Sequence, residues 1–253
     1  MNDAFERAVD FQREFDRRRA ELTIRAAHGT AYLTPSLPRV YDLNAFVVDR
    51  GTTAGAQELI AEADPILGSH GLEHRKISID DDLGRGVEPG FRNAGWQIVE
   101  HVVMPHVRPA PALDLARVEE IAADELVSVW QAGMGREDLD ADTVDQLVRA
   151  QLARRDHTHV RYFATRVDGR PASYCELFSD GETGQIESVM TDPELRGRGL
   201  GKLVVAGALA ASQAAHGSTF LVADANDRPK ELYRTLGFEN AGGVYRFLLP
   251  AQP

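Results

Sequence analysis

The sequence predicts a mixed α/β protein with two domains in tandem, each a twisted mixed β-sheet flanked by helices. Length is the first observation: 253 residues are too many for one ordinary domain and suit two. The second is an order of strand, loop, helix, strand, short helix, glycine, aromatic residue and strand that occurs in both halves. A composition of 43% hydrophobic and 26% charged residues is typical of a globular protein and excludes a disordered chain.

The chain opens with the pattern of an amphipathic helix. Asn2 or Asp3 can cap it, and its inward stripe consists of Phe5, Ala8, Val9, Gln12 and Phe15. A basic run at residues 17–19 alternates with acidic neighbours, which favours a solvated helix end over an anion site. Extended segments are predicted over 22–26, 31–33 and 41–48.

A proline-rich stretch divides the chain. Residues 104–111 contain three prolines, which cannot continue a helix or a central strand, so we place the domain boundary there, with domains 1–108 and 109–253. Beyond it, apolar spacing predicts helices over 113–131 and 142–155, and then strands over 161–166, 172–178 and 185–191. The remaining elements are a helix over 199–215, a strand over 219–223, a short helix over 229–236 and C-terminal strands.

Three pairs of segments carry the internal repeat. The strand at 44–49 matches the strand at 187–192, at a spacing of 143 residues. The helices that follow end in His-Gly pairs 146 residues apart, and the segments that begin at Phe91 and Tyr233 are 142 residues apart. Three ordered matches at nearly constant spacing predict two related domains.

Charge and cysteine content restrict the function. A net charge of −11 disfavours nucleic acid as a partner and would attract a cationic substrate. Cys175 is the only cysteine, so no intramolecular disulfide can form, and we expect a cytoplasmic protein. The opening residues lack the apolar stretch of a signal peptide, and no run of about 18 apolar residues predicts a membrane span.

The most informative stretch is QIESVMTDPELRGRGLGK, residues 185–202. An apolar strand leads through an Asp-Pro loop into a glycine-rich turn and a helix, which is the arrangement that cradles a pyrophosphate. The Walker A pattern fails because Arg196 and Leu203 stand where it needs a glycine and a hydroxyl residue. The dinucleotide fingerprint meets Lys202 at its third glycine, although Asp224 imitates its ribose-binding acid.

A third cradle pattern, a basic or amide residue followed by glycines, is satisfied by Arg196, Gly199 and Gly201. A second motif comprises Asn226, Tyr233, Gly237 and Phe238. With these two motifs in order, residues 112–250 resemble the GNAT superfamily of acyl-CoA-dependent N-acyltransferases. The first half resembles the same fold but departs from the motifs, because Thr53 replaces the first glycine and Phe91 replaces the tyrosine.

The resemblance implies a binding site for acetyl-CoA as co-substrate, with no metal. The sheet would splay at the strand 185–191, and the pantetheine arm would lie along its backbone. The implied cofactor-binding residues are Val189, Met190, Thr191, Arg196, Gly197, Arg198, Gly199, Leu200, Gly201, Lys202 and Asn226. A free strand amide near Val189 would contact the developing oxyanion.

Two residues are catalytic candidates. Tyr233 would protonate the leaving thiolate, and the alternative is an aromatic ring packed under the cofactor. Glu187 would act as the general base, and the alternative is a buried salt bridge. Asn226 would bond the pantetheine or cap the next helix, and Cys175 is expected to be a small core residue rather than a nucleophile.

We therefore expect the second domain to transfer an acetyl group from acetyl-CoA to a primary amine of a small molecule or peptide by direct attack. The first domain would be a degenerate structural copy. The alternative function is a non-catalytic acyl-CoA-binding or regulatory module. The identity of the amine and the choice between a monomer and a homodimer stay open.

Overall fold

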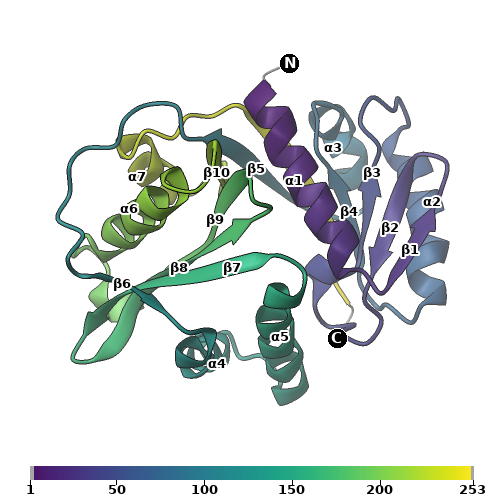
Figure 1. Ribbon diagram of the computed structural model, residues 1–253. Helices are drawn as coiled ribbons and strands as arrows, with labels where there is room; N and C mark the ends of the chain where they lie inside the picture. The colour runs from purple at the N-terminus through teal and green to yellow at the C-terminus, as the bar shows by residue number, and fades with distance from the viewer. Residues whose placement is uncertain (1–2, 252–253) are drawn as a thin grey trace. The chain divides into compact units, whose positions relative to one another are not determined.

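The computed structural model describes residues 3–251, which form two compact units (Figure 1). The N-unit comprises residues 12–102, 224–226 and 242–251, and the C-unit comprises residues 3–11, 103–223 and 227–241. Each unit is discontinuous in sequence, because the C-terminal strand belongs to the N-unit and residues 3–11 belong to the C-unit. The division at residue 108 remains a prediction about the two copies of the repeat.

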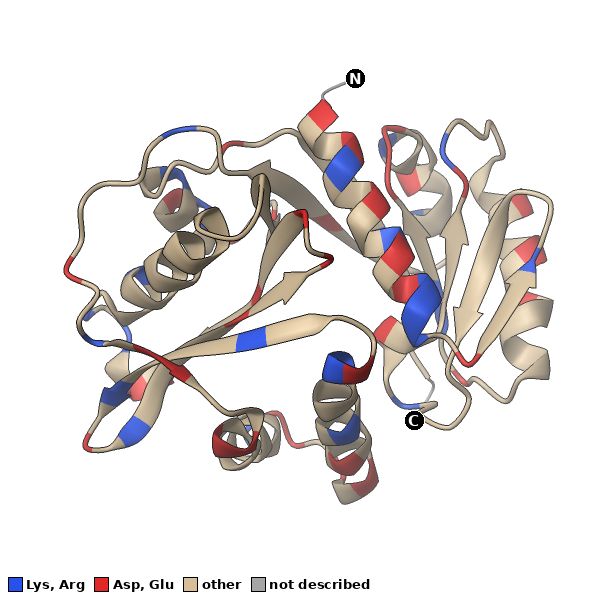
Figure 2. Ribbon diagram, viewed as in Figure 1, with Lys and Arg blue, Asp and Glu red and all other residues tan. Residues whose placement is uncertain are grey.

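Helix α1 (Asp3–Arg19) is the predicted opening helix, and the candidate cap Asn2 lies outside the described residues. Four residues of its predicted stripe are buried: Phe5, Ala8, Val9 and Phe15. Acidic and basic residues alternate along its surface (Figure 2). Arg17 and Arg18 both pair with Glu14, which confirms that the basic run is a solvated helix end.

The N-unit is a mixed sheet in the order β1-β2-β3-β4-β11-β5. Its strands are β1 (Leu22–Arg25), β2 (Gly29–Leu33), β3 (Ala45–Val48), β4 (Arg75–Ile79), β11 (Gly242–Leu249) and the first part of β5 (Gln97–Pro105). The pairing of β3 with β4 is parallel, and the pairing of β4 with β11 is antiparallel. The predicted extended segment 41–48 begins with a short 3₁₀ turn, Tyr41–Leu43, before β3.

Two helices complete the N-unit: α2 (Ala56–Ser69) and α3 (Leu83–Asn93). They pack on an apolar core with Leu59, Phe91 and Phe247 among its fully buried members. The ring of Phe91 stacks on Phe247 at a centroid distance of 4.1 Å and meets Trp96 edge-on at 5.1 Å. The short helix and aromatic residue of the first repeat are thus core-forming elements.

The C-unit has a sheet in the order β5-β10-β9-β8-β7-β6, which begins with the end of β5. The other strands are β6 (Val118–Ile121), β7 (His159–Val167), β8 (Arg170–Ser179), β9 (Thr183–Thr191) and β10 (Ser218–Asp224). Among the described strands β6 to β10, the pairing of β9 with β10 is parallel, and the pairings of β6 with β7, β7 with β8 and β8 with β9 are antiparallel. The unit is therefore a mixed sheet like the N-unit.

Helices lie on both faces of the C-unit sheet (Figure 1). One face carries α6 (Leu200–Gln213), where Cys175 Sγ donates to the carbonyl of Val204. The other face carries α4 (Val127–Gly135), whose Trp130 packs with Tyr162 and Tyr174, and α5 (Ala141–Ala153). Since side chains alternate along a strand, Glu176 shares the α4 face with Tyr174. A short helix α7 (Pro229–Thr235) follows β10.

The predicted helix over 113–131 is wrong in its first part. Residues 118–121 form β6, a 3₁₀ turn follows at Ala123–Leu126, and α4 begins only at Val127. Strand β6 is held by ion pairs from Glu119 to Arg166 at 2.9 Å and from Glu120 to Arg161 at 2.6 Å. Local spacing does not reveal these partners because they lie on β7, more than forty residues away.

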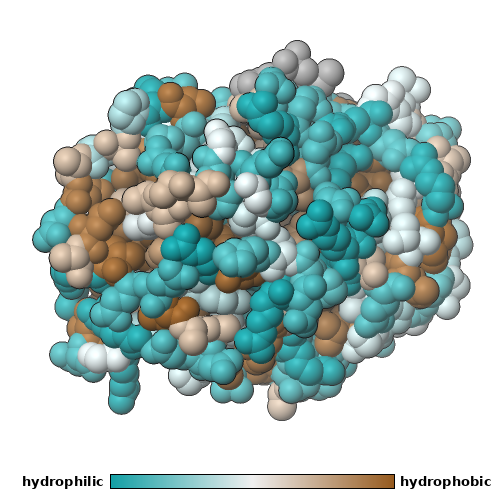
Figure 3. Space-filling model, in the orientation of Figure 1, coloured by the Kyte–Doolittle hydropathy of each residue, from teal (hydrophilic) through white to brown (hydrophobic). Residues whose placement is uncertain are grey.

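The visible face of the space-filling view is mostly hydrophilic, with apolar residues in scattered small groups (Figure 3). The large apolar side chains that are exposed among the described residues are Leu22, Val99, Val107 and Met190. Within residues 3–251, the helices are too short or too polar to span a membrane.

Candidate active site

Strand β9 changes register in the middle of the C-unit sheet. Glu187 pairs with Glu176 of β8, whereas Met190 pairs with Tyr174, so two residues of β9 lie opposite Cys175 alone. The first of the two, Ser188, has a φ of 53°, which is unusual for a residue with a side chain. This is a β-bulge, which bends the strand and leaves the extra residue out of the ladder with β8, before the pairing resumes at Met190.

The parallel pairing of β9 with β10 ends close to this bulge. The register of the two strands stops at Ile186 and Leu221, while β9 continues to Thr191 and β10 to Asp224. Beyond the last pair, the two strands leave the ladder that joined them. The predicted cofactor-binding residues Val189, Met190 and Thr191 all lie on the part of β9 that is no longer paired with β10, and Met190 is 45% exposed.

The loop after β9 is open at its glycines. Gly197 and Gly199 have φ values of 77° and 76°, and no atom lies within 4 Å of the place where a Cβ would stand on either residue. Only glycine adopts this backbone at little cost, and the open space lets a ligand approach the chain closely. Gly199 is the N-cap of α6.

The first turn of α6 presents unbonded amides. The N–H of Leu203 is the one that donates to the carbonyl of Gly199, so the N–H groups of residues 200–202 precede the first helical hydrogen bond. These amides and the positive end of the helix dipole favour an anion at this place. The predicted pyrophosphate residues 196–202 thus form one continuous loop and helix start, with Arg196 and Arg198 exposed.

Glu187 is half-buried and directly precedes the bulge in β9. Gln185 Nε2 donates to its Oε2 at 2.5 Å, and the N–H of Ser188 donates to its Oε1 at 3.2 Å. Burial raises the pKa of Glu187, and the neighbouring Glu176 adds to the rise, whereas its hydrogen bonds and Arg154 oppose it. A carboxylate with a raised pKa suits proton transfer near neutral pH.

Three polar residues beside Glu187 were missed by the sequence analysis. Arg154 Nη1 donates to Glu176 Oε2 at 2.7 Å and to Ser188 Oγ at 3.1 Å. The Glu176 side chain is 0% exposed, and its Oε1 has no hydrogen-bond partner. The signal for Glu176 was present, because it is a lone carboxylate in the apolar run of β8.

Tyr233 lies on α7 and is 7% exposed. Burial raises the pKa of its phenol, and the negative charge of Glu187 raises that pKa further. The phenol therefore keeps its proton at neutral pH and feels the charge of Glu187. Cys175 is completely buried, and burial raises the pKa of its thiol, which confirms a core residue rather than a nucleophile.

Asn226 is exposed in the loop between β10 and α7, and the structure assigns it to the N-unit. Its N–H donates to Asp224 Oδ1 at 2.7 Å. The alternative role as a helix cap is wrong, because the N-cap of α7 is Arg228, which makes no side-chain cap bond. A pantetheine contact of Asn226 stays a prediction.

The matching loop of the first copy is closed. Glu58 Oε2 accepts a hydrogen bond from the N–H of Gly55, the N-cap of α2, at 2.9 Å. A carboxylate of the chain itself therefore stands at the start of this helix, where it disfavours a phosphate. Phe91, the counterpart of Tyr233, packs in the core and carries no hydroxyl.

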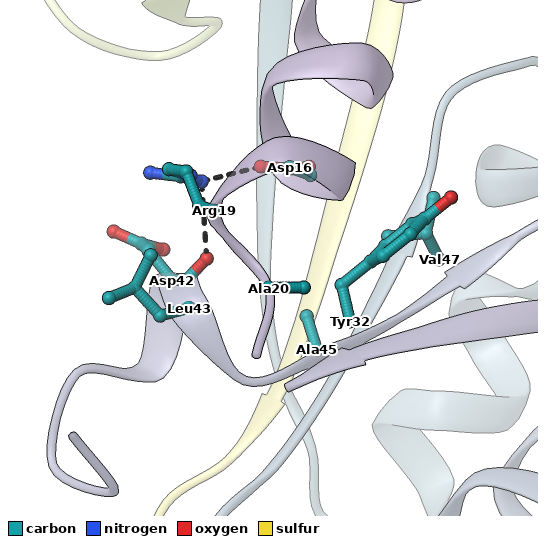
Figure 4. Close-up of a pocket in the computed structure, with 8 residues that line it drawn as sticks. All are labelled: Asp16, Arg19, Ala20, Tyr32, Asp42, Leu43, Ala45 and Val47. Atoms are coloured by element: carbon teal, nitrogen blue, oxygen red, sulfur yellow. Dashed lines mark hydrogen bonds and ion pairs between the residues drawn. The ribbon is translucent and has the colours of Figure 1, made fainter. Parts of the chain in front are cut away.

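A small pocket of the N-unit lies elsewhere (Figure 4). Arg19 Nη2 donates to Asp16 Oδ1 at 2.5 Å and to the carbonyl of Asp42 at 3.5 Å, so polar groups of the chain bond one another there. The pocket contains none of the predicted site residues. Among residues 3–251, no group of three or more histidine, cysteine, aspartate or glutamate side chains is placed to hold a metal ion.

Several solved structures share the fold. A protein of unknown function from Staphylococcus epidermidis ATCC 12228 has 16% identity and a TM-score of 0.69, with 90% of this chain and 93% of that chain covered. A GCN5-related N-acetyltransferase from Kribbella flavida has 18% identity and a TM-score of 0.67, with 100% and 97% covered. A tandem GNAT protein from the clavulanic acid biosynthesis pathway has 15% identity and a TM-score of 0.56, with 92% and 85% covered.

At these identities the likeness shows the fold alone, and no curated protein matches the sequence. A family model gives the more specific result, because the acetyltransferase (GNAT) family matches residues 115–238. That segment contains the bulged strand, the open glycine loop, Glu187 and Tyr233. Residues 115–238 are therefore a domain of the acetyltransferase (GNAT) family.

Proposed function

We propose that the second copy transfers an acetyl group from acetyl-CoA to a primary amine by direct attack. The observation that carries the proposal is the end of the pairing between β9 and β10 beside an open glycine loop. Strand backbone that has lost its pairing with β10 suits the amide-rich pantetheine arm, and the helix start suits the pyrophosphate. Residues 189–191 would hold the first and residues 196–202 the second, with Asn226 as a further pantetheine contact.

In the first step, Glu187 accepts a proton from the protonated acceptor. The neutral amine nitrogen then attacks the thioester carbonyl carbon, and the carbonyl electrons move to the oxygen. The N–H of Val189, the second residue of the bulge, is our candidate donor to that oxyanion. As the intermediate collapses, the carbon–sulfur bond breaks and the sulfur leaves as a thiolate.

Tyr233 then donates its phenolic proton to the sulfur, which gives free CoA, and the Tyr233 phenolate takes up the extra proton that the nitrogen of the new amide still carries. Its pKa is raised in part by the charge of Glu187. Once Glu187 has taken the acceptor's proton, that charge is neutralised and the phenol becomes a stronger acid. The two residues are thus coupled so that the acid strengthens at the stage when the thiolate forms.

The net charge of −11 supports a cationic acceptor, since it raises the local concentration of a protonated amine. The lone buried cysteine supports a reducing compartment, and we include a cytoplasmic location in the proposal. Neither observation selects a particular amine. The acyl group is proposed as acetyl because acetyltransferase is the family description that the segment matches.

The test is release of free CoA from acetyl-CoA, measured across polyamines, aminoglycosides, amino acids and peptide amines. We expect one class to be turned over, and both Glu187→Gln and Tyr233→Phe to lower kcat while leaving the Kd for CoA nearly unchanged. Unchanged rates in both variants would contradict the assigned roles. Binding of CoA without turnover of any amine would favour the non-catalytic acyl-CoA-binding module instead.

A further inference from the structure

The bulge in β9 rests on a residue in an unfavourable conformation. Three described residues other than glycine have a positive φ: Asp138, Asp168 and Ser188. The two aspartates lie outside helices and strands, where their short polar side chains tolerate such a backbone. Ser188 instead lies inside a strand, with Glu187 before it and Val189 after it. A strained residue persists only when its surroundings hold it in place.

The guanidinium group of Arg154 holds Ser188 in this conformation. Arg154 stands in the 3₁₀ turn Arg154–Asp156, and its Nη1 donates to Ser188 Oγ at 3.1 Å and to Glu176 Oε2 at 2.7 Å. The Arg154 side chain is 22% exposed, whereas the Glu176 side chain is 0% exposed. An ion pair with one fully buried partner keeps its geometry better than a surface pair, because water does not compete for the carboxylate.

The same guanidinium faces two carboxylates. Glu176 and Glu187 are directly opposite each other on β8 and β9, so their side chains lie on one face of the sheet. Two such carboxylates cannot both ionise readily without a neighbouring cation. Arg154 provides this cation and at the same time bonds the residue next to Glu187.

We propose that Arg154 is a positioning residue for the acetyl transfer: paired with Glu176, it holds Ser188 in the bulge and thereby fixes the Glu187 carboxylate and the Val189 amide. The inference rests on the proposed function, in which Glu187 is the base. Arg154 touches neither the acceptor nor acetyl-CoA in this scheme. It acts through Ser188 and through its charge.

The charged and titratable groups around Glu187 make the proposal testable through the pH dependence of kcat/KM. They are Glu176 on β8, Arg154 in the 3₁₀ turn, Gln185 on the same strand and Tyr233 on α7, while Tyr162 and Tyr174 face Glu176. Glu176 raises the pKa of Glu187 and Arg154 lowers it. A deprotonated base is required, so kcat/KM falls on the acid side of that pKa.

The experiment compares Arg154→Met, Glu176→Gln and Ser188→Ala with one acceptor, so that the acceptor's own ionisation is constant. We expect Arg154→Met to shift the acid limb of kcat/KM to higher pH and Glu176→Gln to shift it to lower pH. Ser188→Ala should lower kcat about tenfold, with the KM for acetyl-CoA unchanged. The matched control is Arg149→Met, which removes an exposed ion pair with Asp145 on α5 and should change none of these values.

A double variant covers the case in which Arg154→Met fails to fold. Replacing Arg154 and Glu176 together by methionine removes both partners, so that neither leaves a buried unpaired charge. We expect the double variant to fold and to remain about tenfold slower than the unmodified protein. A folded double variant with the original kcat and acid limb would overturn the positioning role.

Hydrogen exchange measures the local stability of the bulge and does not require an active enzyme. In Arg154→Met or the double variant, we expect the Ser188 and Val189 amides to exchange about tenfold faster. Unchanged exchange at both amides would overturn the proposal even if no acceptor is known.

If Glu187→Gln keeps the original kcat, the base role fails and the positioning role with it. If Glu187→Gln is slow but the Arg154 variants keep the original kcat and limb, only the positioning role fails.

Discussion

Helices α6 and α2 occupy corresponding positions in the two copies. The groups next to the N-terminal amides of the two helices differ. Before α6, two glycines with positive φ leave the backbone open to a ligand. Before α2, the carboxylate of Glu58 bonds the N-cap amide. The order of strand, loop and helix is the same in both copies. A few side chains therefore decide whether this fold offers an anion site or a capped helix.

The candidate chemistry differs between the copies in the same way. Glu187 is a half-buried carboxylate with a raised pKa, whereas its counterpart Asn44 is a fully buried neutral amide. Asn44 accepts from the N–H of Thr34 at 2.8 Å and donates to the carbonyls of Leu37 and Val40. A side chain with every bond to the chain satisfied stabilises the fold and is not poised to move a proton.

The largest effect should come from valine at the glycine loops. Gly199→Val and Gly51→Val place a branched side chain at φ values of 76° and 78°, with open space at both sites. Both should cost about 1–3 kcal/mol of unfolding free energy. Only Gly199→Val should weaken acetyl-CoA binding, by roughly 100-fold, because only that loop belongs to the proposed pyrophosphate site. Calorimetric titration measures the affinity, and equal weakening by both variants would erase the distinction.

Exchange of the aromatic residues should have the next largest effect. Tyr233→Phe should lower kcat by about 10- to 100-fold with little change in stability, because one donor is lost from the site. Phe91→Tyr should leave kcat unchanged and cost about 1–3 kcal/mol, because its hydroxyl enters an apolar core. Steady-state kinetics and urea unfolding measure the pair. An unchanged kcat in Tyr233→Phe would show that Tyr233 is a packing residue, as Phe91 is.

Stability should depend on pH at Glu187 but not at Asn44. The folded-state pKa of Glu187 is raised, so the folded state keeps the proton to higher pH than the unfolded state does. Ionisation of Glu187 therefore lowers the free energy of unfolding. This loss is absent at acid pH and grows as the pH rises from the ordinary carboxyl pKa through the raised pKa. Glu187→Gln should stabilise the protein above that window and hardly change it below.

The matched variant Asn44→Ala should destabilise the protein by about 1–3 kcal/mol at every pH, because it leaves buried backbone groups unbonded. Urea unfolding across pH measures both variants. A parallel pH profile for Glu187→Gln and the unmodified protein would contradict a raised pKa at Glu187.

The smallest effect should come from Glu58→Ala at the start of α2. Loss of its bond to Gly55 should cost about 0.5–1 kcal/mol of unfolding free energy. The stoichiometry of CoA binding should stay at one per chain, because the loop from Arg50 to Gly55 is short and lacks the paired glycines of the second copy. A second binding event in this variant would show that the cap alone had closed the first copy.

Local patterns were enough to predict much of this molecule. Helix α1, the strands β7 to β9 and the glycine loop are signalled by residues that are neighbours in sequence. Strand β6 was misread as helix because the arginines that hold it are on β7. The placement of β11 beside β4 was equally hidden, since the pairing joins residues more than 160 positions apart.

The candidate site shows the same limit. Motif spacing selected Tyr233 and the glycine loop, and a carboxylate within an apolar strand selected Glu187, whose roles stay predictions. The bond from Arg154 to Ser188 depends on the register of β8 against β9 and on the turn before β7, which no local pattern encodes. Asn226 does not cap α7, because the helix begins at Pro229 with Arg228 as its N-cap. A cap by Asn226 would require the helix to begin two residues earlier.

Hydrogen exchange with and without acetyl-CoA tests the central claim, that only the second copy binds the cofactor. The account predicts slower exchange of the amides of residues 197–202, together with Val189 to Thr191, on addition of acetyl-CoA. Amides of residues 51–57 should exchange at the same rate with and without it. Protection at the start of α2, or no protection at the start of α6, would contradict the account.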